Sequence, residues 1–553
     1  MNIKHLSAAL SVAPQIAPAD VPEIAAAGYK AIICNRPDGE GADQPSFREV
    51  ELAAQAEGIP VRYLPVIPGQ LSDAQAGEFG RLLDELPKPV LAYCRTGMRS
   101  ASLWGLSRGG SMPPAEILAR AGECGYDLSA LVRRMVAPDS RVDFVDAVHQ
   151  VVIVGAGAAG IAVAASLRAR DPDLDVAIID PADVHYYQPG WTLVGAGVFD
   201  AGETVRAVGA LVPRGVRWIK SAVSHFDPER DTVVLEGCRR VRYKQLVVCP
   251  GLKLDWGAIA GLEDTLGANG VTSNYRFDLA PYTWELVQSF RGGTALFTQP
   301  PMPIKCAGAP QKAMYLSCDA WRRRGVLDQA DVRFETAGTA LFGVADYVPA
   351  LMDYVRAYGI SLDFGRRLTA VDGACRVATF AVAAPDGERV EQVPFDFLHV
   401  VPPQVAPDFI RASPLADAAG WVDVDQSTLR SKRYPNVFAL GDAANTPNAK
   451  TAAAARKQAP VVAHNVLFAR GRGAREARYD GYGSCPLTVE RGKIVLAEFT
   501  YGGKLAPSFP SWLLDGRKPS RLAWLLKERI LPPLYWQGML RGREWLAKPE
   551  MVG

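Results

Sequence analysis

The sequence predicts an α/β protein built from several domains, and three observations support this fold class. The first 110 residues alternate short strand-like and helix-like segments, which is the pattern of a small α/β domain. An apolar strand at 151–154 continues directly into a glycine-rich turn and a helix, and such a unit is typical of a second α/β domain. The length of 553 residues corresponds to three or four domains at roughly 150 residues each.

Pattern and composition divide the chain into four segments. We expect an N-terminal α/β domain at 1–110, a connector at 111–148, a core at 149–500 with a second dinucleotide-type domain inserted at about 260–390, and an amphipathic tail at 501–553. The connector is expected to hold a helix at 115–135 before a linker.

Composition excludes several classes of protein. The 61 Lys and Arg residues nearly balance the 59 Asp and Glu residues, so a chain-wide basic field for nucleic acid is absent. Nine cysteines in a chain of this length are too few for a disulfide scaffold, and without a C-x-x-C pair we expect no metal site. The N-terminus has no basic stretch followed by an apolar run, so we expect no secretory signal.

The N-terminal domain is expected to alternate strands with helices. Apolar runs and apolar spacing predict strands at 29–34, 61–66 and 89–93 and helices at 20–27, 47–57 and 72–86. The third strand runs directly into Cys94, and a helix follows from Ser100. Backbone N–H groups in such a loop cradle an anion and stabilise a thiolate, so the sequence predicts a reactive cysteine here.

A dinucleotide site is predicted where the strand at 151–154 meets the motif G-x-G-x-x-G. Gly155 permits the tight turn, Gly157 lets the backbone approach a pyrophosphate, and Gly160 lets helix and strand pack closely. A second strand ends at Asp180, 20 residues after Gly160, where a carboxylate that binds a ribose belongs. Strand, glycines, helix and acid together favour a dinucleotide over a chance match.

Two further segments favour FAD as the bound cofactor. One strand ends in Cys249-Pro250-Gly251, and a later strand ends in Gly441-Asp442. The two-domain flavoprotein disulfide reductases carry a similar strand-Gly-Asp segment, and this resemblance implies that Asp442 lies beside the flavin ribityl chain. The alternative for Asp442 is an ordinary acid in a turn after a strand.

A nicotinamide dinucleotide would need a second glycine-rich turn in the inserted domain. The first strand of that domain is expected at 294–297 and is followed by TQPPMP at 298–303. Proline has a fixed φ and no N–H, so this segment cannot form the phosphate cradle. The sequence therefore predicts a different electron donor.

Two cysteines are candidates for redox chemistry. Cys306 precedes a predicted helix and has Lys305 and Lys312 near it, and a helix N-terminus and lysines lower the pKa of a thiol. Cys485 is expected in a turn at 482–487. The alternative for each cysteine is a buried, inert thiol.

Several long motifs, in order, resemble one family over roughly residues 150–550. They are HYYQPGWTLVGAG at 185–197, KCAGAPQK at 305–312, DAAGWVDVD at 417–425, the Gly-Asp segment with KTAAA at 450–454, and YGSCPL at 482–487. These motifs are similar to those of the sulfide:quinone oxidoreductases, especially the type found in mitochondria and related bacteria.

The resemblance implies a two-dinucleotide-binding-domain flavoprotein that oxidises hydrogen sulfide and reduces a ubiquinone-type quinone. The two redox cysteines of the family fall on Cys306, beside the flavin, and Cys485, which carries the persulfide. Exchange of this kind needs accessible thiols of low pKa. Lys312 and Lys450 are candidates to hold negative charge on the thiolate or the flavin, and the alternative is that both are solvated surface lysines. Cys249 is expected to be structural.

The tail combines tryptophan and leucine with arginine and lysine. Neither apolar run around Pro532-Pro533 is long enough to cross a bilayer, and short amphipathic helices of this composition lie in a membrane interface. We therefore expect a peripheral, monotopic enzyme on the cytoplasmic face of the bacterial inner membrane. The alternative is a pair of helices that pack on the core.

The N-terminal domain resembles a phosphatase-fold family. Arg99 completes a Cys-x4-Arg motif with Cys94, which is the spacing of rhodanese-type sulfurtransferases, whereas tyrosine phosphatases use Cys-x5-Arg. We expect sulfane sulfur to pass from the flavoenzyme to an acceptor such as glutathione. The alternatives are an NAD(P)H:quinone reductase, a cysteine phosphatase fused to a flavoprotein, and a redox scaffold without activity. The oligomeric state is left open, with a homodimer among the options.

Overall fold

The computed structural model describes residues 3–41, 44–68, 70–109, 112, 114–128, 131, 147–236, 239–385 and 387–551. The chain forms two compact units, Met1–Val148 with Ser221–Tyr243 and His149–Lys220 with Lys244–Gly553. The expected α/β class is confirmed. The expected domain boundaries stay a prediction, and the connector at 111–148 falls mostly outside the described residues.

The N-terminal unit contains a five-stranded sheet of order β1-β2-β5-β3-β4. Its strands are β1 (Lys4–Ser7), β2 (Leu10–Ala13), β3 (Ala31–Cys34), β4 (Val61–Tyr63) and β5 (Val90–Tyr93). Its helices are α1 (Val21–Ala26), α2 (Phe47–Ala56), α3 (Asp73–Glu85), α4 (Met98–Ser107) and α5 (Pro114–Glu123). The sequence prediction missed β1 and β2, two four-residue strands that form a short hairpin and give little local signal. Helix α5 is shorter than expected because Gly125 takes the left-handed conformation that ends a helix (φ +82°).

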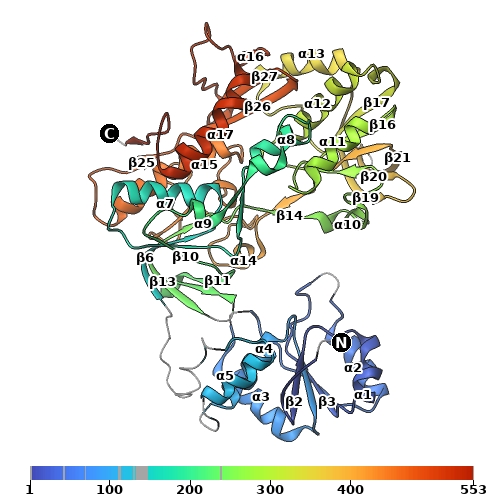
Figure 1. The fold of residues 1–553 in the computed structure, drawn as a ribbon, viewed down its shortest axis with the longest axis vertical. Coiled ribbons are helices and arrows are strands. Elements are labelled where there is room, and N and C mark those ends of the chain that lie inside the picture. The colour runs from blue at the N-terminus through green and yellow to red at the C-terminus, as the bar shows by residue number, and fades with distance from the viewer. Residues whose placement is uncertain are drawn as a thin grey trace. The chain divides into compact units, whose positions relative to one another are not determined.

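A seven-stranded sheet carries the predicted dinucleotide motif (Figure 1). Its order is β10-β7-β6-β13-β12-β11, and β24 also pairs with β13. The bounds are β6 (Ala147–Val154), β7 (Val176–Ile179), β10 (Val216–Ile219), β11 (Val223–Asp227), β12 (Thr232–Leu235), β13 (Arg240–Val248) and β24 (Val437–Ala439). Because β6, β7 and β10 are parallel, the turn after β6 lies at the carboxyl edge of the sheet, where α/β proteins bind ligands.

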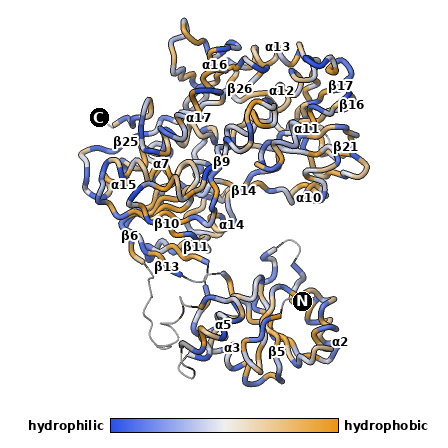
Figure 2. The backbone as a smooth tube through the Cα atoms, viewed as in Figure 1, coloured by the Kyte–Doolittle hydropathy of each residue, from blue (hydrophilic) through white to orange (hydrophobic). Residues whose placement is uncertain are grey.

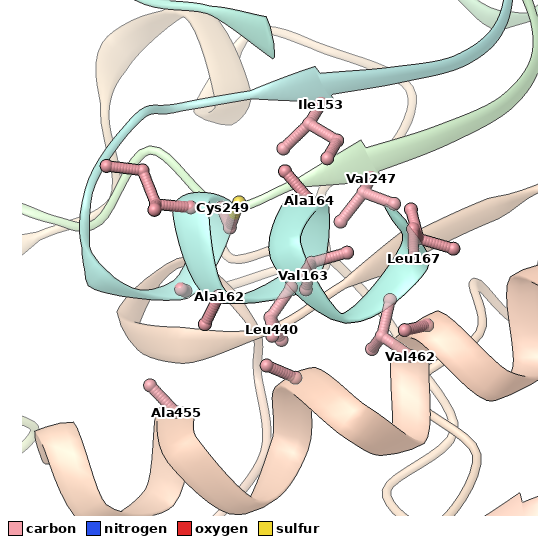
Figure 3. Close-up of a cluster of buried hydrophobic side chains, with 14 of the residues drawn as sticks. Ile153, Ala162, Val163, Ala164, Leu167, Val247, Cys249, Leu440, Ala455 and Val462 are labelled. Atoms are coloured by element: carbon pink, nitrogen blue, oxygen red, sulfur yellow. The ribbon is translucent and has the colours of Figure 1, made fainter. Parts of the chain in front are cut away.

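Helix α7 (Ala158–Arg170) is buried between this sheet and α15 (Ala452–Ala469). Every residue from Ala159 to Leu167 is buried, so this stretch of the helix is covered on all its faces. In Figure 3 side chains of α7 meet Val247 of the sheet on one side and Val462 of α15 on the other. The hydrophobic colouring around β6 and β10 in Figure 2 marks the same core. This packing fixes the helix N-terminus that follows the glycine turn.

A second parallel sheet, of order β15-β22-β16-β17-β18, forms the inserted part of the chain. Its strands are β15 (Val271–Thr272), β16 (Gly293–Gln299), β17 (Ala330–Thr336), β18 (Ser361–Phe364) and β22 (Phe397–His399). Helices α11 (Leu279–Ser289), α12 (Ala309–Arg323) and α13 (Val348–Tyr358) belong to the same part, as does an antiparallel sheet of β19 (Arg366–Asp372), β20 (Val377–Ala384) and β21 (Gly387–Pro394).

The predicted turn at 482–487 is wrong, because these residues open an antiparallel hairpin of β26 (Gly483–Glu490) and β27 (Lys493–Phe499). Cys485 and Leu487 are buried while Ser484 and Pro486 are partly exposed, which is the alternation of a strand. The glycine and proline that indicate a turn are here accommodated within β26.

Shorter elements include β8 (Val184–Tyr186), β9 (Val205–Ala207), α8 (Trp191–Val194), α9 (Val208–Leu211), α10 (Leu262–Thr265), α14 (Asp408–Arg411), β14 (Lys253–Leu254), β23 (Gln404–Val405), β25 (Ala477–Arg478) and β28 (Glu550–Met551).

The tail forms a helical run from Arg521 to Arg541. It comprises α16 (Arg521–Leu525), a π-helical turn (Leu526–Ile530), α17 (Leu531–Pro533), a second π-helical turn (Leu534–Gly538) and a 3-10 turn (Met539–Arg541). One face is buried: Tyr535, Trp536, Met539 and Leu540 join the same core as α7 and α15. The other face is exposed, so the run has both the core-packing and the surface character that the sequence leaves open.

The β24 strand offers a test of how strongly this core holds the site. Phe438 is fully buried, and Phe438→Ala is expected to cost about 3–5 kcal/mol by leaving a cavity. The measurement is chemical denaturation of the whole chain, followed by tryptophan fluorescence. The matched control is Phe364→Ala, whose side chain is 42% exposed and whose loss is expected to stay within about 0.5 kcal/mol. An equal effect of the two variants would contradict the assigned core.

Candidate functional site

A cavity of about 450 Å³ collects most of the predicted site residues. The residues that the sequence predicted for the site and that line this cavity are Gly157, Asp180, Gly251, Cys306, Lys312, Gly441, Asp442 and Lys450. They come from the turns after β6, β7, β13 and β24 and from the start of α12 and α15, so segments far apart in the sequence share one site. Gly155 and Gly160 lie just behind the wall, and Cys485 lies beside Cys306.

The glycine turn has the geometry that a pyrophosphate cradle requires. A Cβ on Gly155, whose φ is +105°, would lie 2.6 Å from the Cys249 carbonyl oxygen, and a Cβ on Gly160 would lie 1.8 Å from the Gly155 carbonyl oxygen. At Gly157, by contrast, a Cβ would meet no atom within 4 Å. The first and third glycines therefore serve packing, while the second leaves backbone open to a ligand.

Asp180 lies at the cavity wall, where the sequence places it. Its carboxylate accepts hydrogen bonds from the Ala156 N–H at 2.6 Å and the Ala182 N–H at 2.8 Å. The carboxylate thus braces the glycine turn from the end of β7. Gly251 and Gly441 have φ values of +81° and +68°, so both turns use conformations that favour glycine.

Three buried side chains on the cavity wall fit a ligand with both donors and acceptors. The Trp191 indole N–H, the Thr192 hydroxyl and both polar atoms of the Asn274 amide have no hydrogen-bond partner within the described part of the chain. Buried polar groups are normally paired, because an unpaired one costs free energy. A flavin dinucleotide offers the carbonyls, ring nitrogens and hydroxyls that would satisfy them, so these residues fit that group.

Cys306 and Cys485 come together although they are far apart in the sequence. Their Sγ atoms lie 3.8 Å apart, with Cys306 in the turn before α12 and Cys485 on β26. The Cys306 backbone has φ +51° and its N–H donates to the Lys450 carbonyl at 2.8 Å. A disulfide has an S–S distance of about 2.05 Å, so this pair needs only a small movement to be bridged.

The cysteine pair is electrostatically asymmetric. The hydrogen bond from Cys485 and then the charge and hydrogen bond of Lys312, whose Nζ lies 3.1 Å from Cys306 Sγ, hold the pKa of the Cys306 thiol well below its usual range. The same hydrogen bond, with burial, holds the pKa of Cys485 well above its usual range. Burial alone would lower the pKa of Lys312, but the cysteine charge raises it. The thiolate of the pair therefore resides on Cys306.

Neither candidate lysine is a solvated surface residue, because Lys312 is 3% exposed and Lys450 is 7% exposed. Lys450 Nζ donates to the carbonyls of Asp442 and Ala444, each at 2.8 Å, and lies 4.2 Å from the centre of the Trp421 ring. Lys450 thus orders the turn after β24, whereas Lys312 contacts the thiolate directly. Burial lowers the pKa of Lys450 to about 8.

Sequence reasoning missed Lys527, which the tail brings into the cavity wall. Its side chain is 4% exposed, its Nζ donates to the Pro189 carbonyl at 3.2 Å, and it lies in the first π-helical turn of the tail. Burial and then the charge of Lys312 lower its pKa to about 7. The sequence analysis places this lysine in the amphipathic tail expected at a membrane interface, and no local signal marks it as buried.

Cys249 lies in the wall of the cavity but is buried. Burial, followed by the charge of Asp180, raises the pKa of its thiol. Its Sγ packs against the glycine turn, 3.8 Å from the Gly155 carbonyl oxygen. A thiol with a raised pKa is a poor nucleophile, which favours the structural role expected for this residue.

The N-terminal unit holds the second predicted site. Cys94 follows β5, is fully buried, and accepts a hydrogen bond from the Gly97 N–H at 3.1 Å. Arg99 does not face an open cradle: its Nη1 and Nη2 donate to both carboxylate oxygens of Glu40 at 2.9 and 2.7 Å. Arg36 donates to the same carboxylate at 2.7 Å. The sequence prediction missed Glu40, which lies far from the motif in the chain.

Within the described residues, no group of three or more His, Cys, Asp or Glu side chains is arranged to hold a metal ion. None of the described helices has both the length and the apolar character that a membrane span requires.

Two family models match the chain. Residues 2–111 match the phosphatase-like domain of the Beta-lactamase hydrolase-like proteins, and residues 149–281 match the Pyridine nucleotide-disulphide oxidoreductases. The first match covers the N-terminal sheet and Cys94, and the second covers the glycine turn and Asp180. The expected flavoprotein and phosphatase-like folds are thereby confirmed.

Individual proteins match most of the remaining chain. The mitochondrial sulfide:quinone oxidoreductase of Dictyostelium discoideum is 40% identical over 404 residues, which are 72% of this chain and 88% of the relative. That of Mus musculus is 38% identical over 71% of this chain and 87% of the relative. The solved structure of the sulfide:quinone oxidoreductase from Aquifex aeolicus has the same fold, with a TM-score of 0.61 at 19% identity over 73% of this chain and 97% of that one. With its cysteine pair, its dinucleotide cavity and these relatives, the chain belongs to the sulfide:quinone oxidoreductase family.

Proposed function

We propose that this protein oxidises hydrogen sulfide with bound FAD and passes the electrons to a ubiquinone-type quinone. The observation that carries the proposal is the Cys306–Cys485 pair, of which Cys306 lines the dinucleotide cavity together with Lys312. The relatives whose names state this activity supply the independent support.

The cysteine pair can perform the sulfur chemistry by thiol–disulfide exchange. When hydrosulfide attacks the Cys485 sulfur of a Cys306–Cys485 disulfide, the S–S bond breaks, a persulfide forms on Cys485, and the electron pair of the broken bond stays on Cys306 as a thiolate. Lys312 stabilises that thiolate. FAD, when bound, supplies the two-electron acceptor that links the cysteine pair to the quinone. Cys306 lines the cavity and Cys485 does not, which supports Cys306 as the residue beside the flavin.

The turn after β16 disfavours the alternative of an NAD(P)H:quinone reductase. Residues 300–303 hold three prolines and no glycine, so few N–H groups are available for a second pyrophosphate. The disulphide oxidoreductase match ends at residue 281, before this strand. Sulfide therefore remains the better electron donor.

The N-terminal unit is proposed to transfer sulfane sulfur through Cys94, with glutathione as a suitable acceptor. Glu40 occupies both arms of Arg99, so a phosphate dianion would have to displace a carboxylate held by two guanidinium groups. A persulfide carries less charge and needs no such displacement. The geometry therefore favours sulfur transfer over hydrolysis of phosphate esters.

The exposed face of the tail is proposed to lie on a membrane, at the cytoplasmic side of the bacterial inner membrane. Trp512, Leu513, Leu522, Leu525 and Ile530 are between 43% and 83% exposed. Arg517, Lys518, Arg521 and Arg529 accompany them and would contact anionic headgroups. The neighbouring Leu526 and Leu531 line the cavity, so a quinone could enter it from this face.

The first test concerns the stabilisation of the Cys306 thiolate by Lys312, on which the proposed activity depends. Lys312→Met removes the ammonium beside the thiolate and is expected to raise the pKa of Cys306, so that fewer thiolates exist at pH 7. We expect alkylation of Cys306 by iodoacetamide, measured by peptide mass spectrometry on the reduced protein, to slow about tenfold for each unit of pKa. Bleaching of the flavin by sulfide should slow with it.

The control for this test is Lys253→Met, since Lys253 is exposed and pairs with Asp408 on the surface. Unchanged alkylation in Lys312→Met, or equal slowing in Lys253→Met, would contradict the proposed role of the lysine.

The N-terminal unit is tested with Cys94→Ser and Glu40→Gln. We expect Cys94→Ser to reduce transfer of sulfane sulfur from glutathione persulfide to cyanide to the background rate, and the partly exposed Cys124→Ser to retain it. Glu40→Gln frees Arg99, so inhibition by inorganic phosphate should become stronger. Transfer at the normal rate by Cys94→Ser, or hydrolysis of p-nitrophenyl phosphate that depends on Cys94, would favour the alternatives.

Membrane association is tested by flotation with vesicles of phosphatidylethanolamine and phosphatidylglycerol. The double change Leu522→Ser and Leu525→Ser removes apolar side chains worth about 1.5–3 kcal/mol each when buried, so binding is expected to fall at least about tenfold. Val390→Ser, at an exposed position on β21, is the control. Flotation of the double variant at the normal level would rule out this face.

A further inference from the structure

Reduction of a quinone needs protons as well as electrons. Each of the two carbonyl oxygens must form an O–H bond, so protons must reach a ligand inside a cavity. The cavity wall contributed by the tail includes Leu526, Leu531 and Leu534, which carry no exchangeable proton, and Lys527, which is only 4% exposed. A proton route that connects the wall with solvent is therefore still needed.

Glu498 on β27 is a buried carboxylate in this wall, 4% exposed. Its Oε1 accepts hydrogen bonds from the Tyr482 hydroxyl at 2.6 Å and from the Ser508 hydroxyl at 2.5 Å, and its Oε2 accepts one from the Ser508 N–H at 3.1 Å. Tyr482 and Ser508 also line the cavity. We name these three residues the Glu498 cluster.

Glu498 differs from the other carboxylates of the wall. Within the described residues, Asp180, Asp442 and Glu498 are the acids that line the cavity. Asp180 is held by backbone N–H groups of the dinucleotide turn, and burial raises the pKa of Asp442 while the charges of Lys450 and Lys305 lower it. Both of these carboxylates belong to the part of the cavity wall that the dinucleotide-binding turns form. Glu498 is held by two hydroxyl groups, which can pass protons.

The position of Glu498 relates the cluster to the redox centre. In the β26–β27 hairpin, Glu498 is opposite Ser484, and the next pair is Cys485 with Ala497. The two pairs are successive, so the side chains of Glu498 and Cys485 point to opposite faces of the hairpin. The cluster is related to the redox centre through the cavity, which Glu498 and Cys306 both line. Phe509 and Pro486 line the cavity beside it and offer apolar surface for a quinone ring.

The cluster also connects the cavity with solvent. Ser508 is exposed, whereas Glu498 is buried behind it. A proton from water can reach the carboxylate through the serine hydroxyl, which donates one proton as it accepts another. The exposed serine, the buried carboxylate and the cavity thus form a short continuous path.

We propose that Glu498 delivers a proton to the quinone and is refilled from solvent water through Ser508, with Tyr482 holding the carboxylate in place. As two electrons derived from sulfide enter the quinone, the Glu498 carboxylate accepts a proton from solvent water through Ser508 and passes it to one quinone oxygen, so that Glu498 ends as a carboxylate again. The second quinone oxygen takes its proton from water as well. The two protons balance the charge of the two electrons and leave two hydroxide ions in the solvent. This inference rests on the proposed function of the cavity.

The test separates the two half-reactions in the flavin-loaded protein by anaerobic stopped-flow absorbance. For Glu498→Gln, which keeps the shape but cannot take up and pass on a proton, we expect flavin reduction by sulfide within twofold of the original rate. Reoxidation by decylubiquinone is expected to slow about 100-fold, the usual contribution of general acid catalysis. Added acetate should restore part of the rate, because a small carboxylic acid can replace the lost donor. Binding of decylubiquinone, followed by tryptophan fluorescence, should be unchanged.

The matched control is Glu490→Gln, at the far end of the same hairpin, where the carboxylate pairs with Arg322 and Lys493 outside the cavity. It should leave both half-reactions unchanged. If Glu498→Gln does not retain flavin, Tyr482→Phe is measured instead, with slower reoxidation and normal reduction expected. Normal reoxidation in the variant measured, or a slowing in Glu498→Gln that acetate leaves unchanged, overturns the proposal. A wild-type flavin that sulfide does not bleach would instead refute the proposed function.

Discussion

The site depends on one buried charge pair, the Lys312 ammonium 3.1 Å from the Cys306 sulfur. In a site of low dielectric constant, either charge alone would be costly, so each stabilises the other. The surrounding elements keep the pair together. Helix α12 carries the lysine, the Cys306 N–H is tied to the Lys450 carbonyl, and Gly308 leaves room for Cys485, because a Cβ there would lie 2.6 Å from its sulfur. Backbone placement thus decides which thiol is ionised.

The tail contributes side chains to the site that the rest of the core forms. Tyr535 donates a hydrogen bond to His185 at 2.6 Å, and His185 in turn contacts the Ala156 carbonyl of the glycine turn at 3.1 Å. Lys527 reaches the cavity from the same helical run. Burial and then the charge of Lys312 lower the pKa of Lys527 to about 7, whereas the charges and hydrogen bonds of the cysteine pair raise the pKa of Lys312 above its usual value. The same helical run therefore contributes side chains near the cofactor pocket and the redox centre, and it also carries the exposed apolar face.

Features that depend on neighbouring residues could be predicted from the sequence, and features that depend on tertiary packing could not. The glycine turn, Asp180 and the cysteine loop before α12 are local patterns, and the structure places them in one cavity. The glycine and proline around Cys485 indicate a turn, whereas pairing with β27 makes this segment a strand. Lys527 and the Glu40–Arg99 pair involve contacts between distant segments, and Glu498 depends on the pairing of β26 with β27, so no spacing rule finds them.

The central claim is that sulfide is oxidised on the Cys306–Cys485 pair. The most direct test is peptide mass spectrometry of the flavin-loaded protein after one equivalent of sulfide is added without air. The account predicts one added sulfur atom on this pair, in the same sample in which the flavin absorbance is bleached. Bleached flavin with both cysteines free of added sulfur would contradict the account, because the electrons would then have bypassed the pair.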